Sequence, residues 1–406
     1  MSRQTQVLVV GGGAAGLMAA ITAAERSRDV ILLEGNDRVG KKILATGNGK
    51  CNFTNEILDP TCYHGEDTAF ISAVLNRFSG RDLRAWFRSA GIESVVKDGR
   101  VYPRSEQASA VLDALRVRLE ATSAQTVTDA KVMSVRQKDD LLEVQTVRET
   151  YLAGSVILAA GSAASPKTGS DGSGYRLAEQ MGLRVKEPLP ALTHLKLKAG
   201  FTKSWAGVRC DGSIMVCTGD KQPAGSSKGQ LQLTAYGISG IPAFEVSRFA
   251  SRALAEGDDV EVHIDFLTDI DGPVEDYLRQ RAQKMAPYPV SQFLNGLVPK
   301  NLAGVLLRES GCDRKKECAR LTEDEIRRIA SLMTDLCVPV TGTGGFEQAQ
   351  VCTGGVTLDQ LDPQSMACRA CPSLYVVGEL TDIDGICGGY NLQWAFATGH
   401  LAGSHA

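Results

Sequence analysis

The sequence has 406 residues, of which 43% are hydrophobic and 22% are charged, and its formal net charge at pH 7 is -3. This length supports a large core in two or three domains, and this charge gives no indication of binding to nucleic acid or to an anionic membrane. The N-terminus runs directly into a strand-sized apolar segment, and we find neither a signal peptide nor a membrane-spanning run. We therefore expect a cytoplasmic protein with a small-molecule substrate and no nucleic-acid or membrane partner.

The cysteine pattern argues against a secreted disulfide framework, because the count of 11 is odd and the spacing is irregular. The CxxC formed by Cys368 and Cys371 has no second pair or histidine at the spacing of zinc ligands. We predict reduced cysteines and no metal ion. The histidines without ligand spacing are His64, His263, His400 and His405.

The first predicted elements form a βαβ unit. Residues 5–10 (TQVLVV) have the pattern of a buried parallel strand, Ala14–Ser27 that of an alanine-rich helix, and Asp29–Glu34 that of a second buried strand. Such a unit is typical of the opening of a doubly wound sheet.

The turn between the first strand and the helix reads GGGAAG and fits the GxGxxG pattern. Gly11 permits the tight turn, Gly13 lets a pyrophosphate approach the helix start, and Gly16 lets the helix pack on the strands. Glu34 ends the second strand, where an acid accepts hydrogen bonds from the ribose hydroxyls. An unmodified 2′-hydroxyl fits NAD or FAD and argues against NADP at this site.

The loop that follows, RVGKKILATGNGKCNFTN, is rich in glycine, lysine and asparagine. We predict that Lys41 and Lys42 neutralise the pyrophosphate. Gly49, Cys51 and Asn52 supply small and amide groups that can reach the edge of an isoalloxazine ring.

Helical patterns follow at residues 68–79 and 81–90, and Ser105 has the position of a cap for a further helix. Alternating hydrophobicity over residues 127–147 predicts a β-meander, and SVILAAGS at 155–162 predicts another buried parallel strand.

The C-terminal segment decides between NAD and FAD. Its strand ends in YVVGEL, and TDIDGICGGYNLQWAFATG continues into a helix. Glu379 lies where an acid can bind ribityl hydroxyls, and Gly388 with Gly389 offers backbone N–H groups to a flavin carbonyl. This arrangement is typical of flavoproteins with two dinucleotide-binding domains. A second GxGxxG for NADH or NADPH is not found in the sequence.

We therefore predict an α/β fold with a Rossmann-type FAD-binding domain formed by both chain ends. From about Glu187 the sequence changes to short strands and turns, and after about Thr268 it becomes mostly helical. The predicted boundaries are 1–189 and 341–406 for the FAD-binding domain and 190–340 for an insert, with a β-barrel part at 190–270 and a helical-bundle part at 271–340.

Several motifs together resemble the BaiN/aminoacetone-oxidase-like family of bacterial NAD(P)/FAD-dependent flavoproteins. They are GKKILATGNGKCNFTN, GRVYPRSEQASAVLDAL, VILAAGSAASPKTGSDGSGYRLAEQMG, YGISGIPA, QVCTGGV and GELTDIDGICGGYNLQWAFATGHLAG. The resemblance implies the same bipartite fold and a backbone contact from Val132 to adenine. It also marks a departure, because the family leads us to expect a histidine where Ala235 stands.

Patterns and resemblance together give one set of predicted cofactor-binding residues. They are Gly11, Gly13, Ala14, Ala15, Gly16, Glu34, Gly35, Lys41, Lys42, Gly49, Cys51, Asn52, Val132, Ala160, Gly161, Gly378, Glu379, Asp384, Gly388, Gly389, Tyr390, Asn391 and Leu392. Cys51 and Cys387 lack the CxxxxC spacing of disulfide reductases, so we expect both to be small apolar fillers.

The resemblance implies hydride transfer at flavin N5. We expect an NADH- or NADPH-linked reductase of an enone or ketone, such as a steroid or bile-acid intermediate. The alternatives are an oxidase of a small aminoketone or amine, and a non-catalytic flavin-binding redox sensor. A tRNA-modifying enzyme is disfavoured by the acidic balance. Candidate proton donors are Tyr390, Tyr236 and His194, and the oligomeric state stays open.

Overall fold

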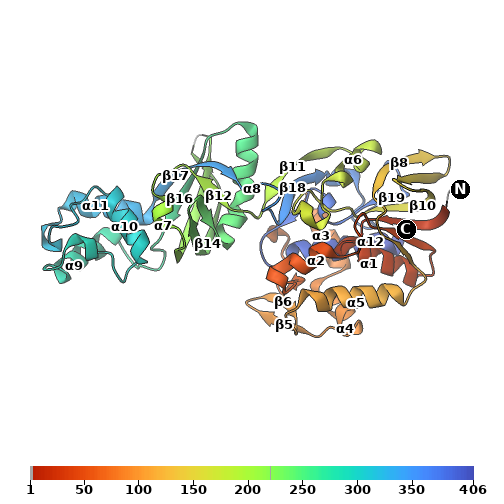
Figure 1. Cartoon of the computed structure of the whole chain (residues 1–406), viewed down its shortest axis with the longest axis horizontal. Coiled ribbons are helices and arrows are strands. Elements are labelled where there is room, and N and C mark those ends of the chain that lie inside the picture. Colours follow the sequence, from red (N-terminus) through yellow and green to blue (C-terminus); the bar gives the residue numbers. More distant parts are fainter. Residues whose placement is uncertain (1–2, 220) are drawn as a thin grey trace. The chain divides into compact units, whose positions relative to one another are not determined.

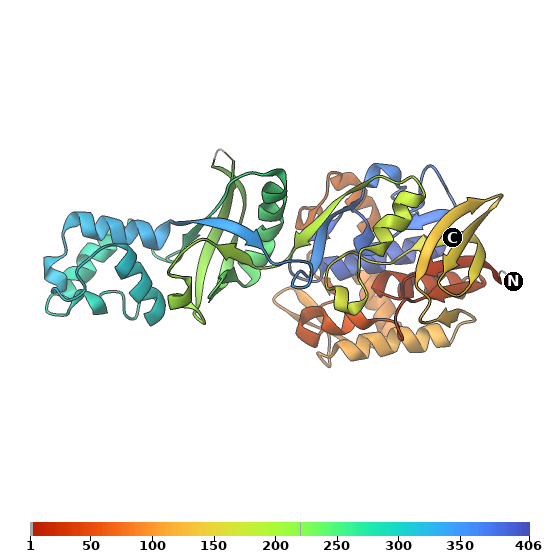
Figure 2. The same ribbon diagram turned by 45° about the horizontal axis from the view of Figure 1, so that its top comes forward.

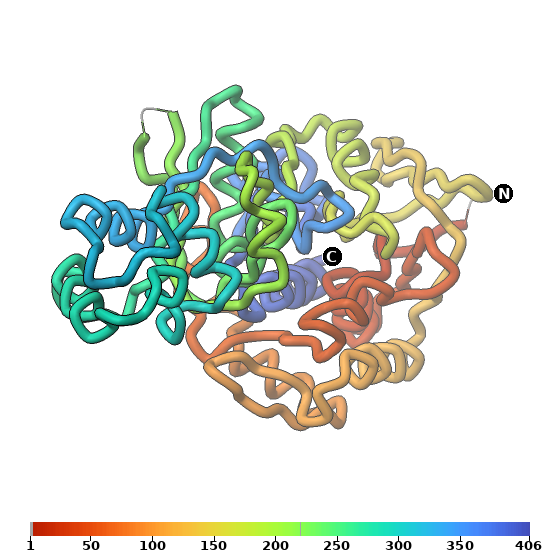
Figure 3. The backbone as a smooth tube through the Cα atoms, turned by 60° about the vertical axis from the view of Figure 1, so that its left-hand side comes forward, coloured from red at the N-terminus to blue at the C-terminus, as the bar shows by residue number. Residues whose placement is uncertain are grey.

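The computed structural model describes residues 3–219 and 221–406 and divides the chain into two compact units. Unit 1 comprises Met1–Leu189 and Ala349–Ala406, and unit 2 comprises Pro190–Gln348. Figure 3 shows that the N-terminal and C-terminal parts of the chain lie together in unit 1. The end of unit 2 differs from the predicted residue 340, because the strand at Leu336–Thr343 belongs to its barrel.

Unit 1 is built on a seven-stranded sheet in which five strands are parallel and two form an antiparallel meander. The parallel strands are β7 (Gln125–Val127), β2 (Val30–Leu33), β1 (Arg3–Val10), β10 (Thr150–Leu158) and β19 (Leu374–Val376). The meander strands are β9 (Leu141–Thr146) and β8 (Val132–Lys138). The sheet and its covering helices confirm the predicted Rossmann-type α/β fold.

Strand β10 has two different partners along one edge. Its residues Thr150–Ala153 pair antiparallel with β9, and its residues Val156–Leu158 pair parallel with β19. The strand predicted at 155–162 is therefore only the second half of a longer strand. The first half completes the predicted meander.

Helices α1 (Ala14–Glu25) and α12 (Tyr390–His405) pack against each other beside this sheet (Figure 1). Glycines permit the close approach: a Cβ on Gly399 would lie 2.3 Å from the carbonyl oxygen of Ala15, and one on Gly403 would lie 2.4 Å from that of Ala19. The two segments that carry the cofactor motifs are thereby held together.

The other helices of unit 1 are α2 (Lys41–Ala45), α3 (Thr68–Arg77), α4 (Gly80–Ser89), α5 (Ala108–Glu120) and α6 (Ser173–Gln180). Its short strands are β3 (Thr54–Asn55), β4 (Tyr63–His64), β5 (Ser94–Lys97), β6 (Arg100–Pro103), β11 (Val185–Ala191), β18 (Val351–Val356) and β20 (Asp384–Gly385). The predicted cap Ser105 is wrong. Gln107 is the residue at the start of α5, and its side chain makes no capping hydrogen bond.

Unit 2 contains a closed barrel with the strand order β12-β15-β14-β13-β16-β17. The strands are β12 (Leu195–Leu197), β13 (Arg209–Thr218), β14 (Gln222–Thr234), β15 (Gly237–Ser239), β16 (Val260–Asp265) and β17 (Leu336–Thr343). A short helix, α7 (Thr202–Trp205), lies between β12 and β13 in the chain. The two-part insert that the sequence predicts thus contains a closed barrel.

Two groups of helices accompany the barrel. Helices α9 (Val274–Lys284), α10 (Lys300–Glu309) and α11 (Glu323–Thr334) lie between β16 and β17 in the chain and group together on one side (Figure 2). Helix α8 (Ile241–Glu256) packs on the barrel strands, and the expectation of only strands and turns before residue 268 is wrong there. Pro242 in its first turn and Gly257 at its C-cap, with φ of 87°, are its sequence signals.

Among the described residues, the structure contains no helix that is both long and apolar enough to cross a membrane.

Candidate cofactor site

The turn between β1 and α1 requires glycine at two positions for packing. A Cβ on Gly11, where φ is 104°, would lie 2.5 Å from the carbonyl oxygen of Ala159. A Cβ on Gly16 would lie 1.8 Å from the carbonyl oxygen of Gly11. Gly13 is different, because a Cβ there would meet no described heavy atom within 4 Å. The third glycine therefore leaves free space at the start of the helix.

Glu34 ties the end of β2 to this turn. Its Oε2 accepts a hydrogen bond of 2.8 Å from the backbone N–H of Gly12. Its Oε1 accepts from the backbone N–H of Asn36 at 2.8 Å and from the side-chain amide of Asn36 at 2.7 Å. A carboxylate has about four lone-pair sites, so acceptor capacity remains for a ribose hydroxyl. The role in ribose binding stays a prediction.

The two predicted lysines each have a carboxylate partner. Nζ of Lys42 lies 2.5 Å from Oε2 of Glu379, and the same oxygen accepts a hydrogen bond of 2.9 Å from the Ser162 hydroxyl. Lys41 pairs instead with Asp37 at 2.6 Å. Sequence reasoning missed Ser162, although it directly follows the strand that ends in VILAAG.

The loop around Cys51 has an unusual backbone. Gly47, Asn48, Gly49 and Cys51 all have φ between 53° and 82°. Cys51 is buried, and burial raises the pKa of its thiol from 9.0 to about 12. The thiol is therefore neutral near pH 7, as expected for a filler rather than for a thiolate partner of a flavin.

This loop contacts the glycine turn that precedes α12. A Cβ on Gly389 would lie 2.7 Å from Oδ1 of Asn52 and 2.5 Å from the carbonyl oxygen of Thr54. The side-chain amide of Asn55 donates a hydrogen bond of 2.9 Å to the carbonyl oxygen of Gly388. Asn55 was missed by sequence reasoning. These contacts join two segments of the chain that carry separate cofactor motifs.

The first residues of α12 are fixed by packing and hydrogen bonds. Tyr390 is buried, and its ring meets that of Tyr63 edge-on at a centroid distance of 5.6 Å. The side chain of Asn391 exchanges two hydrogen bonds of 2.8 Å with the backbone of Gly385. Tyr390 thus packs as a core aromatic at the helix start, and its predicted role as a proton donor stays untested.

The remaining predicted residues lie in several elements of unit 1. A Cβ on Gly378 would lie 3.0 Å from the Cβ of Ala15, so the turn that follows β19 touches the start of α1. Ala160 and Gly161 follow β10, and Ala14 is the first residue of α1. Lys131 packs near Gly35, next to Val132 at the start of β8. Asp384 lies in β20 and Leu392 in the first turn of α12.

These observations fit a dinucleotide. The N-termini of α1 and α12 both lack a side-chain cap in the described structure, so backbone N–H groups at each are available to an anion or a carbonyl. Oδ1 of Asn52 is buried and has no hydrogen-bond partner among residues 3–219 and 221–406. A bound polar group would satisfy that oxygen.

His194 and Tyr236, the other proposed proton donors, both lie in unit 2. Their ring centroids are 4.4 Å apart. Desolvation and the charge of Lys196 lower the pKa of His194, so its imidazole is neutral near pH 7. Tyr236 is exposed. The barrel therefore places two of the three proposed donors side by side.

A family model described as "HI0933-like protein Rossmann domain" matches residues 5–405. The chain belongs to this HI0933-like family. This match confirms the family resemblance that the motifs indicated. It also confirms the prediction that the protein is a flavin-dependent oxidoreductase that binds FAD.

Curated relatives cover nearly the whole chain. The HI0933-like protein is 39% identical to the 3-dehydro-bile acid delta(4,6)-reductase of Clostridium scindens, over 98% of each chain. It is 26% identical to the ribosomal RNA dihydrouridine synthase of Haemophilus influenzae over 98% of each chain. The same enzyme of Escherichia coli is 27% identical, with 96% of this chain and 95% of that one aligned.

Among solved structures, the fold is similar to that of 3-ketosteroid-delta4-(5alpha)-dehydrogenase from Rhodococcus jostii RHA1. The TM-score is 0.51 at 15% identity, covering 99% of this chain and 96% of that one. At this identity the likeness shows a shared fold only.

Proposed function

We propose that this HI0933-like protein reduces a carbon–carbon double bond conjugated to a carbonyl group in a steroid-like small molecule. The observation that carries the proposal is the 39% identity over 98% of both chains with a 3-dehydro-bile acid delta(4,6)-reductase. That name describes a 3-keto group and ring double bonds, which together form an enone. We further propose NADH or NADPH as the electron donor and the cytoplasm as the site of action.

The overall reaction takes NAD(P)H, a proton and an enone to NAD(P)⁺ and a saturated ketone. When bound, FAD supplies hydride acceptance and donation at N5. The protein then has to orient the substrate, exclude water and provide one proton to the carbon next to the carbonyl. Burial raises the pKa of the Cys51 thiol to about 12, so this scheme assigns no thiolate role to Cys51.

Tyr236 and His194 are the proposed source of that proton. A tyrosine hydroxyl and a neutral imidazole next to it can act as donor and relay. The ring centroids of the two side chains are 4.4 Å apart. Tyr236 directly follows Ala235, which stands where the family resemblance leads us to expect a histidine. We infer that His194 takes over part of the role of the residue absent at position 235.

A second candidate is reduction of uridine in ribosomal RNA, favoured by the two dihydrouridine synthases that align over nearly the whole chain. Dihydrouridine differs from uridine by two hydrogens across a double bond conjugated to a carbonyl. The chemistry is thus of the same type. The lower identities of 26% and 27% and the net charge of -3 favour the small molecule.

The test is anaerobic reduction of the FAD-loaded protein by NADH and by NADPH, followed by reoxidation with a 3-keto-Δ4 steroid. Bleaching of the flavin absorbance by one nucleotide and its return on adding the steroid support the proposal. Return only with unmodified ribosomal RNA, with dihydrouridine detected by mass spectrometry, supports the second candidate.

The two remaining alternatives, an oxidase and a non-catalytic redox sensor, give different results in the same flavin-reduction assay. Bleaching by an aminoketone or amine, with oxygen consumption afterwards, identifies an oxidase. A flavin that no nucleotide, amine or enone reduces or reoxidises identifies a non-catalytic redox sensor. Either result overturns the reductase proposal.

A further inference from the structure

The outer face of the unit 2 barrel brings together three side chains that are typical metal ligands. Along β16, Val260, Val262 and Ile264 are buried, whereas the alternating residues Glu261 and His263 are only partly buried. In β17, Leu336 and Val338 are likewise buried, and Cys337 between them is exposed. All three face away from the barrel core, because successive side chains of a strand point to opposite faces.

The strand register places these residues next to each other. His263 is the direct partner of Cys337 across β16 and β17. The ligand atoms of Glu261, His263 and Cys337 all lie within 4.8 Å of one another. In a tetrahedral site with ligand atoms about 2.0–2.3 Å from zinc, those atoms lie about 3.3–3.8 Å from one another. Binding zinc therefore requires side-chain rotations that bring the ligand atoms about 1 Å closer together.

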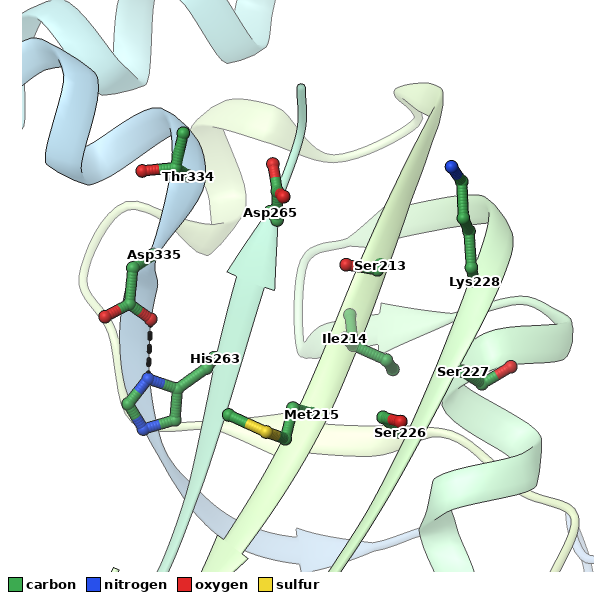
Figure 4. A pocket seen from close by; sticks show the side chains of 10 residues that line it. All are labelled: Ser213, Ile214, Met215, Ser226, Ser227, Lys228, His263, Asp265, Thr334 and Asp335. Carbon is green, nitrogen blue, oxygen red and sulfur yellow. Dashed lines mark hydrogen bonds and ion pairs between the residues drawn. The ribbon is translucent and has the colours of Figure 1, made fainter. Parts of the chain in front are cut away.

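The imidazole of His263 is already oriented as in metal sites. Its Nδ1 lies 2.6 Å from Oδ1 of Asp335, and Figure 4 shows the other ring nitrogen on the side facing away from that carboxylate. Metal-bound histidines usually donate their second ring N–H to a carboxylate, which fixes the tautomer and the ring plane. Nε2 is then left for a metal ion.

A second observation points to a cation-binding site at this place. Oε2 of Glu261 is buried and has no hydrogen-bond partner within the described part of the chain. A buried carboxylate oxygen without a hydrogen-bond partner is unfavourable, even where the same carboxyl group interacts with the thiol of Cys337. A metal ion held with His263 and Cys337 supplies the interaction that this oxygen lacks.

We propose that Glu261, His263 and Cys337 bind one zinc ion, with Asp335 as the positioning residue of His263. A thiolate, an imidazole and a carboxylate are a zinc ligand set, whereas calcium and magnesium prefer oxygen ligands alone. Three protein ligands leave the fourth position of a tetrahedral ion for water. Sequence spacing gave no sign of this site, since two strands distant in the chain contribute to it.

The position suggests what the ion does. β16 is the last barrel strand before helices α9–α11, and β17 is the first after them. An ion that bridges β16 and β17 therefore links the two strands between which helices α9–α11 are inserted. His263 and Asp335 also border a cavity of about 470 Å³ (Figure 4), which gives solvent a path to this edge of the site.

The experiment uses the full-length, FAD-loaded protein, stripped with a chelator and reloaded with zinc. We expect one zinc ion per chain by elemental analysis after gel filtration. Cys337→Ser and His263→Gln should each lower zinc affinity at least ~100-fold, and Asp335→Asn about 10–100-fold, because Asp335 touches the ligand His263 and not the ion. Cys371→Ser is the matched control, because Cys371 is a partly buried thiol of unit 1, and it should bind zinc as the wild type does.

Cobalt gives an independent readout that does not depend on the variants folding. Wild-type protein loaded with Co²⁺ should show thiolate-to-cobalt charge transfer and the visible bands of a tetrahedral ion, and zinc should displace both. Far-ultraviolet circular dichroism checks the fold of each variant. Wild type without a cobalt–thiolate band, or a folded Cys337→Ser protein that keeps its zinc, overturns the proposal.

Discussion

Lys42 and Glu379 form an ion pair of 2.5 Å between residues that are 337 positions apart in the chain. Each side chain is only about one-fifth exposed, at 21%. The pair fastens helix α2 to the turn after β19, and Ser162 adds a hydrogen bond to the same carboxylate oxygen.

Lys42→Met should destabilise the protein by about 1–3 kcal/mol, between the ranges for exposed and fully buried pairs. Urea unfolding of the FAD-free protein measures the loss. Lys41→Met is the matched control, because Lys41 pairs with an exposed carboxylate of Asp37, and its stability should stay close to that of the wild type. Equal effects of the two substitutions would contradict a special role for Lys42.

Substitution by alanine should impair folding at Gly16 but impair FAD binding at Gly13. The Cβ of Gly16→Ala would lie 1.8 Å from the carbonyl oxygen of Gly11, so this variant should fold poorly. The Cβ of Gly13→Ala meets no described atom within 4 Å, and φ at Gly13 is -80°, which alanine tolerates. Its FAD-free melting temperature should stay near that of the wild type, while FAD affinity falls at least ~10-fold by fluorescence titration. Unchanged affinity would show that no phosphate approaches Gly13.

Cys51 should make stability fall at alkaline pH. Burial raises the pKa of its thiol from 9.0 to about 12, so the folded protein keeps a proton that the unfolded chain loses. This contribution to stability is complete below about pH 9 and is lost as the pH rises toward 12, at about 1.4 kcal/mol per pH unit. Denaturant unfolding of the wild type and of Cys51→Ala at pH 8, 9 and 10 should show a flatter slope for the variant. Parallel slopes would place the thiol in a solvated environment.

Tyr236→Phe should lower the turnover of an enone substrate about 10²–10⁴-fold, which is the usual contribution of a general acid. Hydride transfer from NAD(P)H in the first half-reaction should be unaffected, because that step needs no proton from this residue. Stopped-flow measurement of the two half-reactions separates the effects. Tyr390→Phe is the comparison, since Tyr390 packs against Tyr63 in the core of unit 1. A larger loss from Tyr390→Phe would move the proton donor to unit 1.

Local patterns predicted the parts of the fold that depend on short segments. The βαβ unit from β1 to β2 follows from apolar runs and the glycine turn, and observed and predicted ends agree within a few residues. Helix α8 was missed because it follows four barrel strands, and its cap signals at Pro242 and Gly257 are short compared with the surrounding strand pattern. Ser105 has a good cap side chain, but the helix begins later, after Gln107.

The candidate sites likewise contain residues that local spacing predicts and residues that depend on contacts between distant segments. The places of Glu34 and Gly13 at the glycine turn were predictable, because they follow from spacing relative to one turn, and their roles in cofactor binding stay predictions. Ser162 and Asn55 gain their contacts only when segments distant in sequence meet, at Glu379 and Gly388 respectively. The cluster around His263 likewise depends on strand register, which spacing along the chain does not encode.

The shared edge of β10 sets the order in which the protein can be assembled on the ribosome. Val156–Leu158 must wait for Leu374–Val376, and α12 follows later still. All six barrel strands lie within Leu195–Thr343. The whole barrel is therefore synthesised before β19, the strand that pairs with β10 in the sheet of unit 1. The parallel half of β10 therefore lacks its partner β19 throughout the synthesis of the insert.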